Sequence, residues 1–417
     1  MPRSRKKAKA RRSLALHLNI TFTELSDPPL CRIGFAVRTI YFDYNATTFL
    51  DPLVRDAMLP FLGGIYGNPS SIHHIGRQAR VILDDARERV AKVWQCKPSE
   101  VVFTSGGTES NNLAIFGAAR HFKAKGRHLI TSQVEHHAVL HCFEYLARHE
   151  EFDVTYLPVD QEGLVDPDSL RAAIRHDTSL VSIMAANNET GTIQPVADLG
   201  AICRERGVAF HTDAVQWFGK EQFTSIHQFN ADLVSICAHK IHGPKGTGAL
   251  FIKSPLLPDP ILFGGGHENE RRAGTENLAG IIGLTEALER FLDPPVFSKP
   301  LLLPLTSRLI GCAESLEGTT VRGSRSSRLN NTVAFSVVGC DSISLLASLD
   351  LEGVCASSGS ACSAGSLLPS HVLKAMAVNN EEASSLVRFS LGRDSTLAEV
   401  EAVENILPLV VRRVRGY

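Results

Sequence analysis

Short apolar runs alternate with longer amphipathic segments over most of the chain, and this pattern predicts strands that alternate with helices. Strands are expected at 101–104, 128–131, 154–157, 180–184, 208–211, 231–236 and 248–252. Helices are expected at 51–62, 77–94, 109–119, 138–149, 167–174, 196–206 and 277–292. Apolar strands joined by helices are typical of a mainly parallel sheet covered on both faces, so we predict an α/β fold.

The pattern changes after the Pro-rich stretch 293–295. Strands then follow near 332–337, 354–357 and 386–390, with helices near 343–349, 367–377 and 397–414. We therefore predict a large domain at 57–296 and a smaller α+β domain at 297–417. The segment 39–56 is expected to join the smaller domain, and residues 1–38 to form a basic extension.

The composition limits the classes of protein to which the chain can belong. The 417 residues are 44% hydrophobic and 21% charged with a formal net charge of -1, which is typical of a soluble enzyme. The chain as a whole is therefore not biased towards nucleic acid, and no apolar run approaches the roughly 18 residues that a membrane-spanning helix needs. Nine cysteines without a C-x-x-C pair favour reduced thiols and a cytoplasmic location.

The N-terminus departs from this composition. Residues 1–12 are rich in Lys and Arg, and the first acidic residue is Glu24. We favour a disordered extension over an organelle-targeting peptide, although such a peptide is also basic and poor in acidic residues. A nucleic-acid-binding arm is a further alternative, although no later basic or aromatic pattern supports it.

Lys240 stands between the apolar runs 231–236 and 248–252. Burying an ammonium group costs several kcal/mol unless the charge is paired or neutralised. A covalent bond to an aldehyde neutralises it, so we predict that Lys240 carries pyridoxal phosphate as a Schiff base.

Polar motifs follow other predicted strands, where sheets of this kind bind ligands. The glycine turn 105–108 suits a phosphate, or is an ordinary turn between a strand and a helix. Asp213 could pair with a protonated pyridine nitrogen or be a structural cap. His136 could stack on a flat ring or move protons, and the polar loop 187–191 could face a ligand, although each has an ordinary structural alternative.

Taken together and in order, these motifs resemble fold-type I pyridoxal phosphate enzymes, and specifically the NifS-like cysteine desulfurases of the class-V aminotransferases. The resemblance runs from about residue 40 to the end. It rests on segments 41–48, 67–73, 103–112, 135–136, 187–191, 213–216, 239–240, 264–268, 272–277, 357–362 and 387–393. It implies a large domain with a mainly parallel sheet of the seven-stranded type and a smaller C-terminal domain.

The resemblance also implies roles for single residues. The residues expected to bind the cofactor are Gly107, Thr108, His136, Asn188, Asp213, Gln216, Cys237, His239, Lys240 and Thr275. Thr275 would reach the phosphate in the neighbouring subunit of a homodimer. Asn45, Asn188 and Arg388 are expected to bind the substrate, with Arg388 clamping its carboxylate. At Cys237 the family usually has a serine that binds the phosphate, so a weak thiol donor stands here.

Cys362 decides the expected reaction. It lies in 355–366, a run of small residues typical of a mobile loop, although a cysteine there could be only a small hydrophobic residue. The resemblance to group I desulfurases implies three catalytic residues, Lys240, Cys362 and His136. Sulfur from L-cysteine would pass to Cys362 as a persulfide with release of L-alanine, and then to an acceptor such as an iron–sulfur scaffold or a tRNA-thiolation protein.

Three rival interpretations stay open. A selenocysteine lyase would share the fold and depend less on Cys362. An aminotransferase or a kynureninase-like hydrolase would share Lys240 and would not need Cys362. A metal site at Cys237, His239 and His242 is disfavoured, because side chains on a strand and turn alternate between faces and no fourth ligand is obvious.

Overall fold

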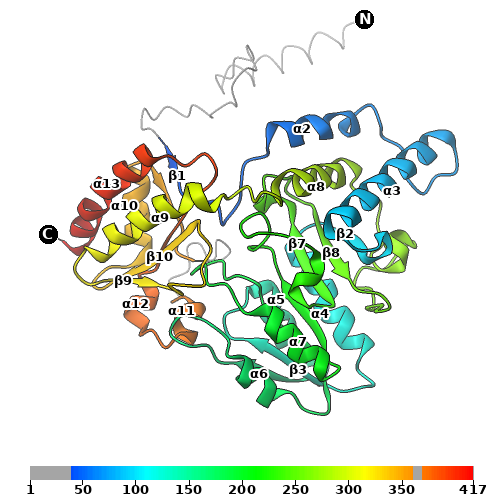
Figure 1. The fold of residues 1–417 in the computed structure, drawn as a ribbon, viewed down its shortest axis with the longest axis horizontal. Helices are drawn as coiled ribbons and strands as arrows, with labels where there is room; N and C mark the ends of the chain where they lie inside the picture. The colour runs from blue at the N-terminus through cyan, green and yellow to red at the C-terminus, as the bar shows by residue number, and fades with distance from the viewer. Residues whose placement is uncertain (1–38, 360–368, 417) are drawn as a thin grey trace, which may run out of the picture. The chain divides into compact units, whose positions relative to one another are not determined.

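The computed structural model describes residues 39–359 and 369–416, which belong to one compact unit beginning at Thr39 (Figure 1). Its largest sheet has seven strands in the order β2-β8-β7-β6-β5-β3-β4. The strands are β2 (Val101–Thr104), β3 (His128–Ser132), β4 (Asp153–Leu157), β5 (Thr178–Ser182), β6 (Ala209–Asp213), β7 (Leu233–Cys237) and β8 (Gly248–Ile252). β8 pairs antiparallel with both neighbours, and the remaining pairs are parallel, so the sheet is mainly parallel, as predicted.

Helices cover both faces of this sheet. They are α2 (Pro52–Met58), α3 (His74–Trp94), α4 (Gly107–His121), α5 (His137–His149), α6 (Pro167–Ala173), α7 (Val196–Glu205) and α8 (Leu278–Phe291). Short 3₁₀ helices accompany them at η1 (Leu59–Leu62), η2 (Pro98–Glu100), η3 (Ile226–Phe229), η4 (Ala238–Lys240) and η5 (His267–Glu270).

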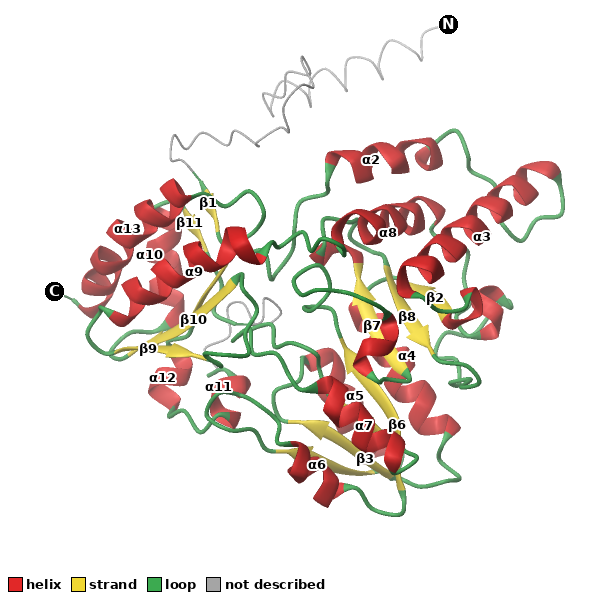
Figure 2. Ribbon diagram, viewed as in Figure 1, coloured by secondary structure: helices red, strands yellow, loops and turns green. Residues whose placement is uncertain are grey.

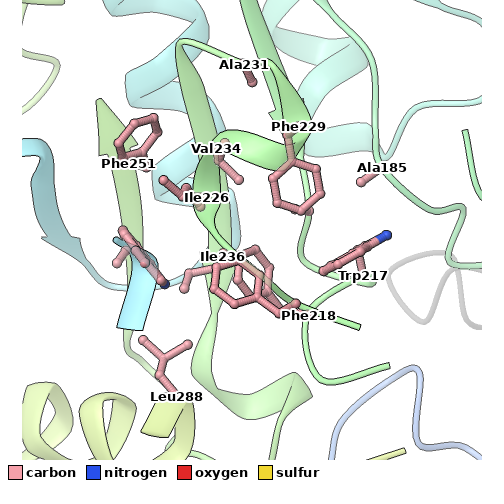
Figure 3. Close-up of a cluster of buried hydrophobic side chains, with 14 of the residues drawn as sticks. Ala185, Trp217, Phe218, Ile226, Phe229, Ala231, Val234, Ile236, Phe251 and Leu288 are labelled. Atoms are coloured by element: carbon pink, nitrogen blue, oxygen red, sulfur yellow. The ribbon is translucent and has the colours of Figure 1, made fainter. Parts of the chain in front are cut away.

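Alternate residues of each strand enter two separate cores, because successive side chains of a strand point to opposite faces. In β7, Val234 and Ile236 pack in the core that α3, α7 and α8 cover, together with Phe251 and Leu288 (Figure 3). Leu233 instead joins the core beneath α4 and α5. This two-sided burial explains why the strands read as continuous apolar runs.

A second group of elements contains a three-stranded antiparallel sheet of β9 (Thr319–Arg322), β10 (Thr332–Val337) and β12 (Val387–Ser390) (Figure 2). The helices that follow α8 in sequence are α9 (Lys299–Glu314), α10 (Ser342–Leu351), α11 (His371–Ala375), α12 (Asn380–Ser384) and α13 (Leu397–Arg415). β1 (Ile40–Tyr41) pairs in parallel with β11 (Val354–Cys355). Phe42 on the first segment is buried in the same core as Phe389 of β12.

The predicted α/β fold is confirmed, and four details differ. The helix expected at 51–62 ends at Met58 and continues as 3₁₀ helix η1, because Pro60 cannot donate a backbone hydrogen bond. α9, β9 and α12 were not predicted. The division into domains at 57–296 and 297–417 stays a prediction. Among the described residues, no helix is both long and apolar enough to cross a bilayer.

Candidate active site

A cavity of about 200 Å³ lies where strands of the large sheet end. It is lined by Asn45, Ala46, Gly107, Thr108, Asn111, His136, Met184, Ala186, Asn188, Asp213, Val215, Gln216, Cys237, His239, Lys240 and Arg388. Every cofactor- and substrate-binding residue expected from the sequence lines it, except Thr275. The expected nucleophile, Cys362, lies outside the described residues.

The register of the sheet brings the chemistry-bearing residues together. β6 and β7 are parallel neighbours with Asp213 opposite Ser235, so both strands end at the cavity. η4 follows β7 directly and carries Lys240 as its last residue. The backbone N–H of Gly243 donates to the carbonyl of Ala238, and this hydrogen bond closes the turn that contains Lys240.

Lys240 projects into the cavity from this turn. Its Nζ donates to the carbonyl oxygens of Asn45 at 2.6 Å and Ala46 at 2.7 Å. Burial lowers the pKa of the amine to about 8, and the nearby Arg388 guanidinium adds to the shift. A minor fraction of the Lys240 amine is therefore neutral near physiological pH, more than for an ordinary lysine.

A cradle of backbone and small side chains lies at one end of the cavity. α4 begins at Gly107 and Thr108, and Gly106 before them has a φ of 152°, which favours glycine. A Cβ atom added at Gly107 would lie 2.8 Å from a methyl group of Val215, so a larger residue would close the cradle. The backbone N–H groups at the start of a helix favour an anion such as a phosphate.

His239 and Cys237 stand beside this cradle. Nδ1 of His239 lies 3.1 Å from the Thr47 hydroxyl, and burial lowers the pKa of the imidazole to about 4. The thiol of Cys237 lies 3.8 Å from the Thr247 carbonyl, at the edge of a weak sulfur hydrogen bond.

Asp213 ends β6 as a buried carboxylate. Its oxygens accept from the Asn111 side chain at 2.6 Å and from the Val215 backbone at 3.0 Å. No Lys, Arg or His side chain forms an ion pair with Asp213 within residues 39–359 and 369–416. A buried carboxylate of this kind suits a cationic partner, and a protonated pyridine nitrogen is one.

His136 caps α5, accepting at Nδ1 from the backbone N–H of Ala138 at 3.1 Å. Burial lowers the pKa of His136, against the opposing effect of Asp213. The imidazole is therefore neutral at pH 7, with a flat face and a second ring nitrogen available for proton transfer.

Arg388 of β12 reaches the opposite side of the cavity and is 1% exposed. Its Nη1 donates to the carbonyls of Asn188 and Gly359, both at 2.7 Å, and its Nη2 to a carboxylate oxygen of Asp43 at 2.7 Å. The other Asp43 oxygen accepts from the Ser357 hydroxyl at 2.9 Å. Nε is buried without a partner among the described residues, so the guanidinium keeps an N–H donor for a ligand.

Comparison with known proteins identifies the family. The family model "Aminotransferase class-V" matches residues 40–403. The cysteine desulfurase IscS of Dictyoglomus turgidum is 47% identical over 379 residues, covering 91% of this chain and 96% of that protein. IscS of Methanosarcina thermophila is 45% identical, covering 91% of this chain and 93% of that protein.

Solved structures agree with this relationship. A NifS-like protein superposes with a TM-score of 0.84 at 36% identity, covering 90% of this chain and all (100%) of the other. SspA in complex with cysteine superposes with a TM-score of 0.74 at 35% identity, covering 86% of this chain and 100% of the other. The chain belongs to the cysteine desulfurase family of class-V aminotransferases. The family and fold that the motifs predicted are therefore confirmed.

In this cysteine desulfurase family member, the residues that flank 360–368 meet at Glu189. The Ser370 hydroxyl donates to Glu189 Oε2 at 2.6 Å. A Cβ atom added at Gly359 would lie 2.8 Å from the same oxygen. His371, next to Ser370, places Nε2 2.9 Å from the carbonyl of Glu135. Both flanks of the segment that contains Cys362 are thus held close to the cavity.

Thr275 is the exception among the expected cofactor-binding residues. It lines a separate hollow with Ser105, Thr247, Glu268 and Arg272. Large apolar side chains are exposed on α2, η1, the segment before α3 and the segment after β8, among them Leu62 (67% exposed), Tyr66 (75%), Ile72 (90%) and Phe263 (83%).

Sequence reasoning missed three residues that shape the site. Asp43 and Asn111 lie inside motifs 41–48 and 103–112, which could have marked them. Lys220 belongs to no such motif, and its only signal is a lysine that follows the aromatic pair Trp217-Phe218 after one glycine.

Proposed function

We propose that this protein is a pyridoxal phosphate-dependent cysteine desulfurase, which takes sulfur from L-cysteine and releases L-alanine. The observation that carries the proposal is the meeting of Lys240, Asp213 and Arg388 in one cavity of a chain from this family. A cytoplasmic location is part of the proposal.

The residues of the cavity fit the cofactor. Lys240 would hold it covalently, Asp213 would pair with its ring nitrogen, and the cradle at Gly107 and Thr108 would hold its phosphate, aided by His239. Gln216 would donate to the ring hydroxyl, and His136 would lie against the ring. When bound, pyridoxal phosphate supplies an electron sink for negative charge at the α-carbon of the substrate.

The chain's own groups then handle the substrate and its protons. Arg388 and Asn188 would bind and orient the amino acid, since a guanidinium suits a carboxylate, and Asn45 would lie beside it. The Nζ of Lys240 can take the α-proton, because a pKa of about 8 leaves part of the amine neutral near pH 7. The neutral imidazole of His136 can accept or return a proton beside it.

Cys362 would supply the nucleophile. Its thiolate attacks the substrate sulfur, a sulfur–sulfur bond forms, and the carbon–sulfur bond breaks with its electron pair remaining on carbon. Protonation of that carbon and return of a proton to the α-carbon give alanine, and the persulfide on Cys362 is carried to an acceptor. An iron–sulfur scaffold or a tRNA-thiolation protein is the proposed acceptor.

We infer that the protein acts as a homodimer. The exposed apolar surface at Leu62, Tyr66, Ile72 and Phe263 is suited to a second copy of the chain. Thr275 does not line the Lys240 cavity of its own chain, and it would complete the phosphate cradle of the second copy.

The test measures alanine and sulfide released from L-cysteine by the purified holoprotein. Cys362→Ala should keep the visible absorption of the bound cofactor but form no persulfide. Lys240→Ala should lose the normal absorption and the activity. An unchanged absorption band in Lys240→Ala, or full persulfide yield in Cys362→Ala, would contradict the assignment.

The same Cys362→Ala variant separates the nearest alternative. A selenocysteine lyase would keep turning over selenocysteine without Cys362, whereas the proposed desulfurase loses cysteine turnover.

A further inference from the structure

Lys220 is a buried amine beside the cavity that the proposed reaction does not use. It is 3% exposed and lies in the turn after β6. Its Nζ lies 5.4 Å from the ring centroid of Phe297. No carboxylate pairs with it in the part of the chain that the structure describes. A charged lysine in such a place would be costly, because no opposite charge compensates its burial.

The hydrogen bonds of Lys220 match a neutral amine. Nζ donates to Oδ1 of Asn45 at 2.6 Å and to Oε1 of Gln216 at 2.5 Å, and both acceptors are uncharged amide oxygens. Burial lowers the pKa of Lys220 well below its usual value, and the nearby Lys240 and Arg388 lower it further. A neutral amine has two N–H donors, and both are used here.

These two bonds fix which way each amide faces. A side-chain amide has one oxygen and one NH₂ group. A donor that is hydrogen-bonded to the oxygen therefore also fixes the direction in which the NH₂ group points. Gln216 Nε2 donates to the Asn45 carbonyl at 2.9 Å, the same oxygen that accepts from Lys240 Nζ at 2.6 Å. Asn45 Nδ2 turns the other way and donates to the Thr332 hydroxyl at 2.9 Å.

We propose that Lys220 is a positioning residue that orients the Gln216 amide, so that its NH₂ group serves the cavity as a donor for the ring hydroxyl of pyridoxal phosphate. Without Lys220, the Oε1 atom of Gln216 would be a buried acceptor lacking its donor, and the amide would be free to turn over. This role rests on the proposed function, because it presumes that the cofactor binds in this cavity.

The test measures the dissociation constant of pyridoxal phosphate from the apoprotein, its absorption maximum when bound, and the melting temperature of each apoprotein. Lys220→Met keeps the length of the side chain and removes both donors. We expect it to weaken cofactor binding roughly tenfold and to move the absorption maximum, as for a buried acceptor left unpaired. In a Gln216→Leu background, the same substitution should change the affinity less than about twofold, because Lys220 acts through Gln216.

Asn331→Leu is the matched control. Asn331 Nδ2 also donates to Asn45 Oδ1, at 3.1 Å, but makes no hydrogen bond to Gln216. It should lower the melting temperature and leave the absorption maximum unchanged. If Lys220→Met behaves in the same way, Lys220 is structural and the proposal fails.

Other outcomes also decide the matter. An equal loss of affinity in the wild-type and Gln216→Leu backgrounds would overturn the proposal, as would no loss in either. If Lys220→Met is insoluble, Lys220→Leu is measured in both backgrounds in its place. If neither variant folds, Lys220 has a structural role and the proposal fails. Absence of cofactor binding by the wild-type protein would overturn the proposed function itself, which separates the two failures.

Discussion

At the scale of single residues, Cys237 stands where the family resemblance leads us to expect a phosphate-binding serine. Its side chain stands beside the cradle, with its Cβ 3.6 Å from where a Cβ on Gly107 would lie. Burial raises the pKa of the thiol, which therefore stays neutral and a weak donor. Cys237→Ser supplies a hydroxyl of nearly the same size, and we expect it to slow cofactor loss about fivefold, as for one added hydrogen bond.

Dialysis of the holoprotein, followed through its visible absorption, measures that rate. Cys237→Ala is the control, because it removes the sulfur without adding a donor and should not slow the loss. A serine variant that loses cofactor as fast as the wild type would show that Cys237 takes no part in holding the phosphate.

Residue types at strand ends could be predicted, and long-range partners could not. Lys240, Asp213 and His136 follow apolar runs, so their place at the edge of the sheet was visible in the sequence. Asp43 binds Arg388 across 345 positions, and Lys220 binds Asn45 across 175. Only the folded chain brings such segments together. The aromatic residues near Lys220 in the sequence do not predict which side chains accept its hydrogen bonds.

At the scale of elements, Glu135 ties the turn between β3 and α5 to the chain that follows β5. Its Oε1 accepts from the Ser132 hydroxyl at 2.6 Å and from the Met184 backbone at 2.9 Å, and its Oε2 has no partner among the described residues. Burial raises the pKa of this carboxyl from 4.5 to about 8. Between these values the folded protein keeps a proton that the unfolded chain has lost, so stability falls as pH rises.

Glu135→Gln should remove this fall in stability with rising pH, because the glutamine oxygen keeps both hydrogen bonds and the side chain carries no charge. We expect the variant apoprotein to be more stable than the wild type by on the order of 3 kcal/mol at pH 8, with little difference at pH 5. Urea denaturation at the two pH values measures the gain. Glu144→Gln on α5 is the control and should give no such pH-dependent gain. A gain of equal size at both pH values would contradict the titration of Glu135.

Elements with one clear period could be predicted, and those with mixed signals could not. α3 and α5 bury one face each and were expected from their spacing. α9 begins with Lys-Pro and contains Pro304, which disguises a helix that nevertheless buries Leu302, Leu305 and Leu309. Packing against β9 and β10 stabilises it where local propensity does not.

At the scale of the whole molecule, the prediction concerns sites shared between two copies of the chain. Thr275 lines a hollow beside Ser105, outside the cavity that contains Lys240. If Thr275 serves the neighbouring cradle, each site needs Lys240 from one chain and Thr275 from the other. Thr275→Asp should therefore impair the site of the partner copy, because its carboxylate would repel the phosphate.

Mixing two impaired variants tests this arrangement. Lys240→Ala and Thr275→Asp homodimers should each be inactive or nearly so. Co-refolded mixtures should recover about a quarter of the wild-type rate, since random pairing makes half the molecules heterodimers with one intact site of two. As a control, a chain carrying both substitutions, mixed with Thr275→Asp, should recover nothing. If heterodimers form, as seen by native mass spectrometry, and activity stays absent, Thr275 acts within its own chain or not at all.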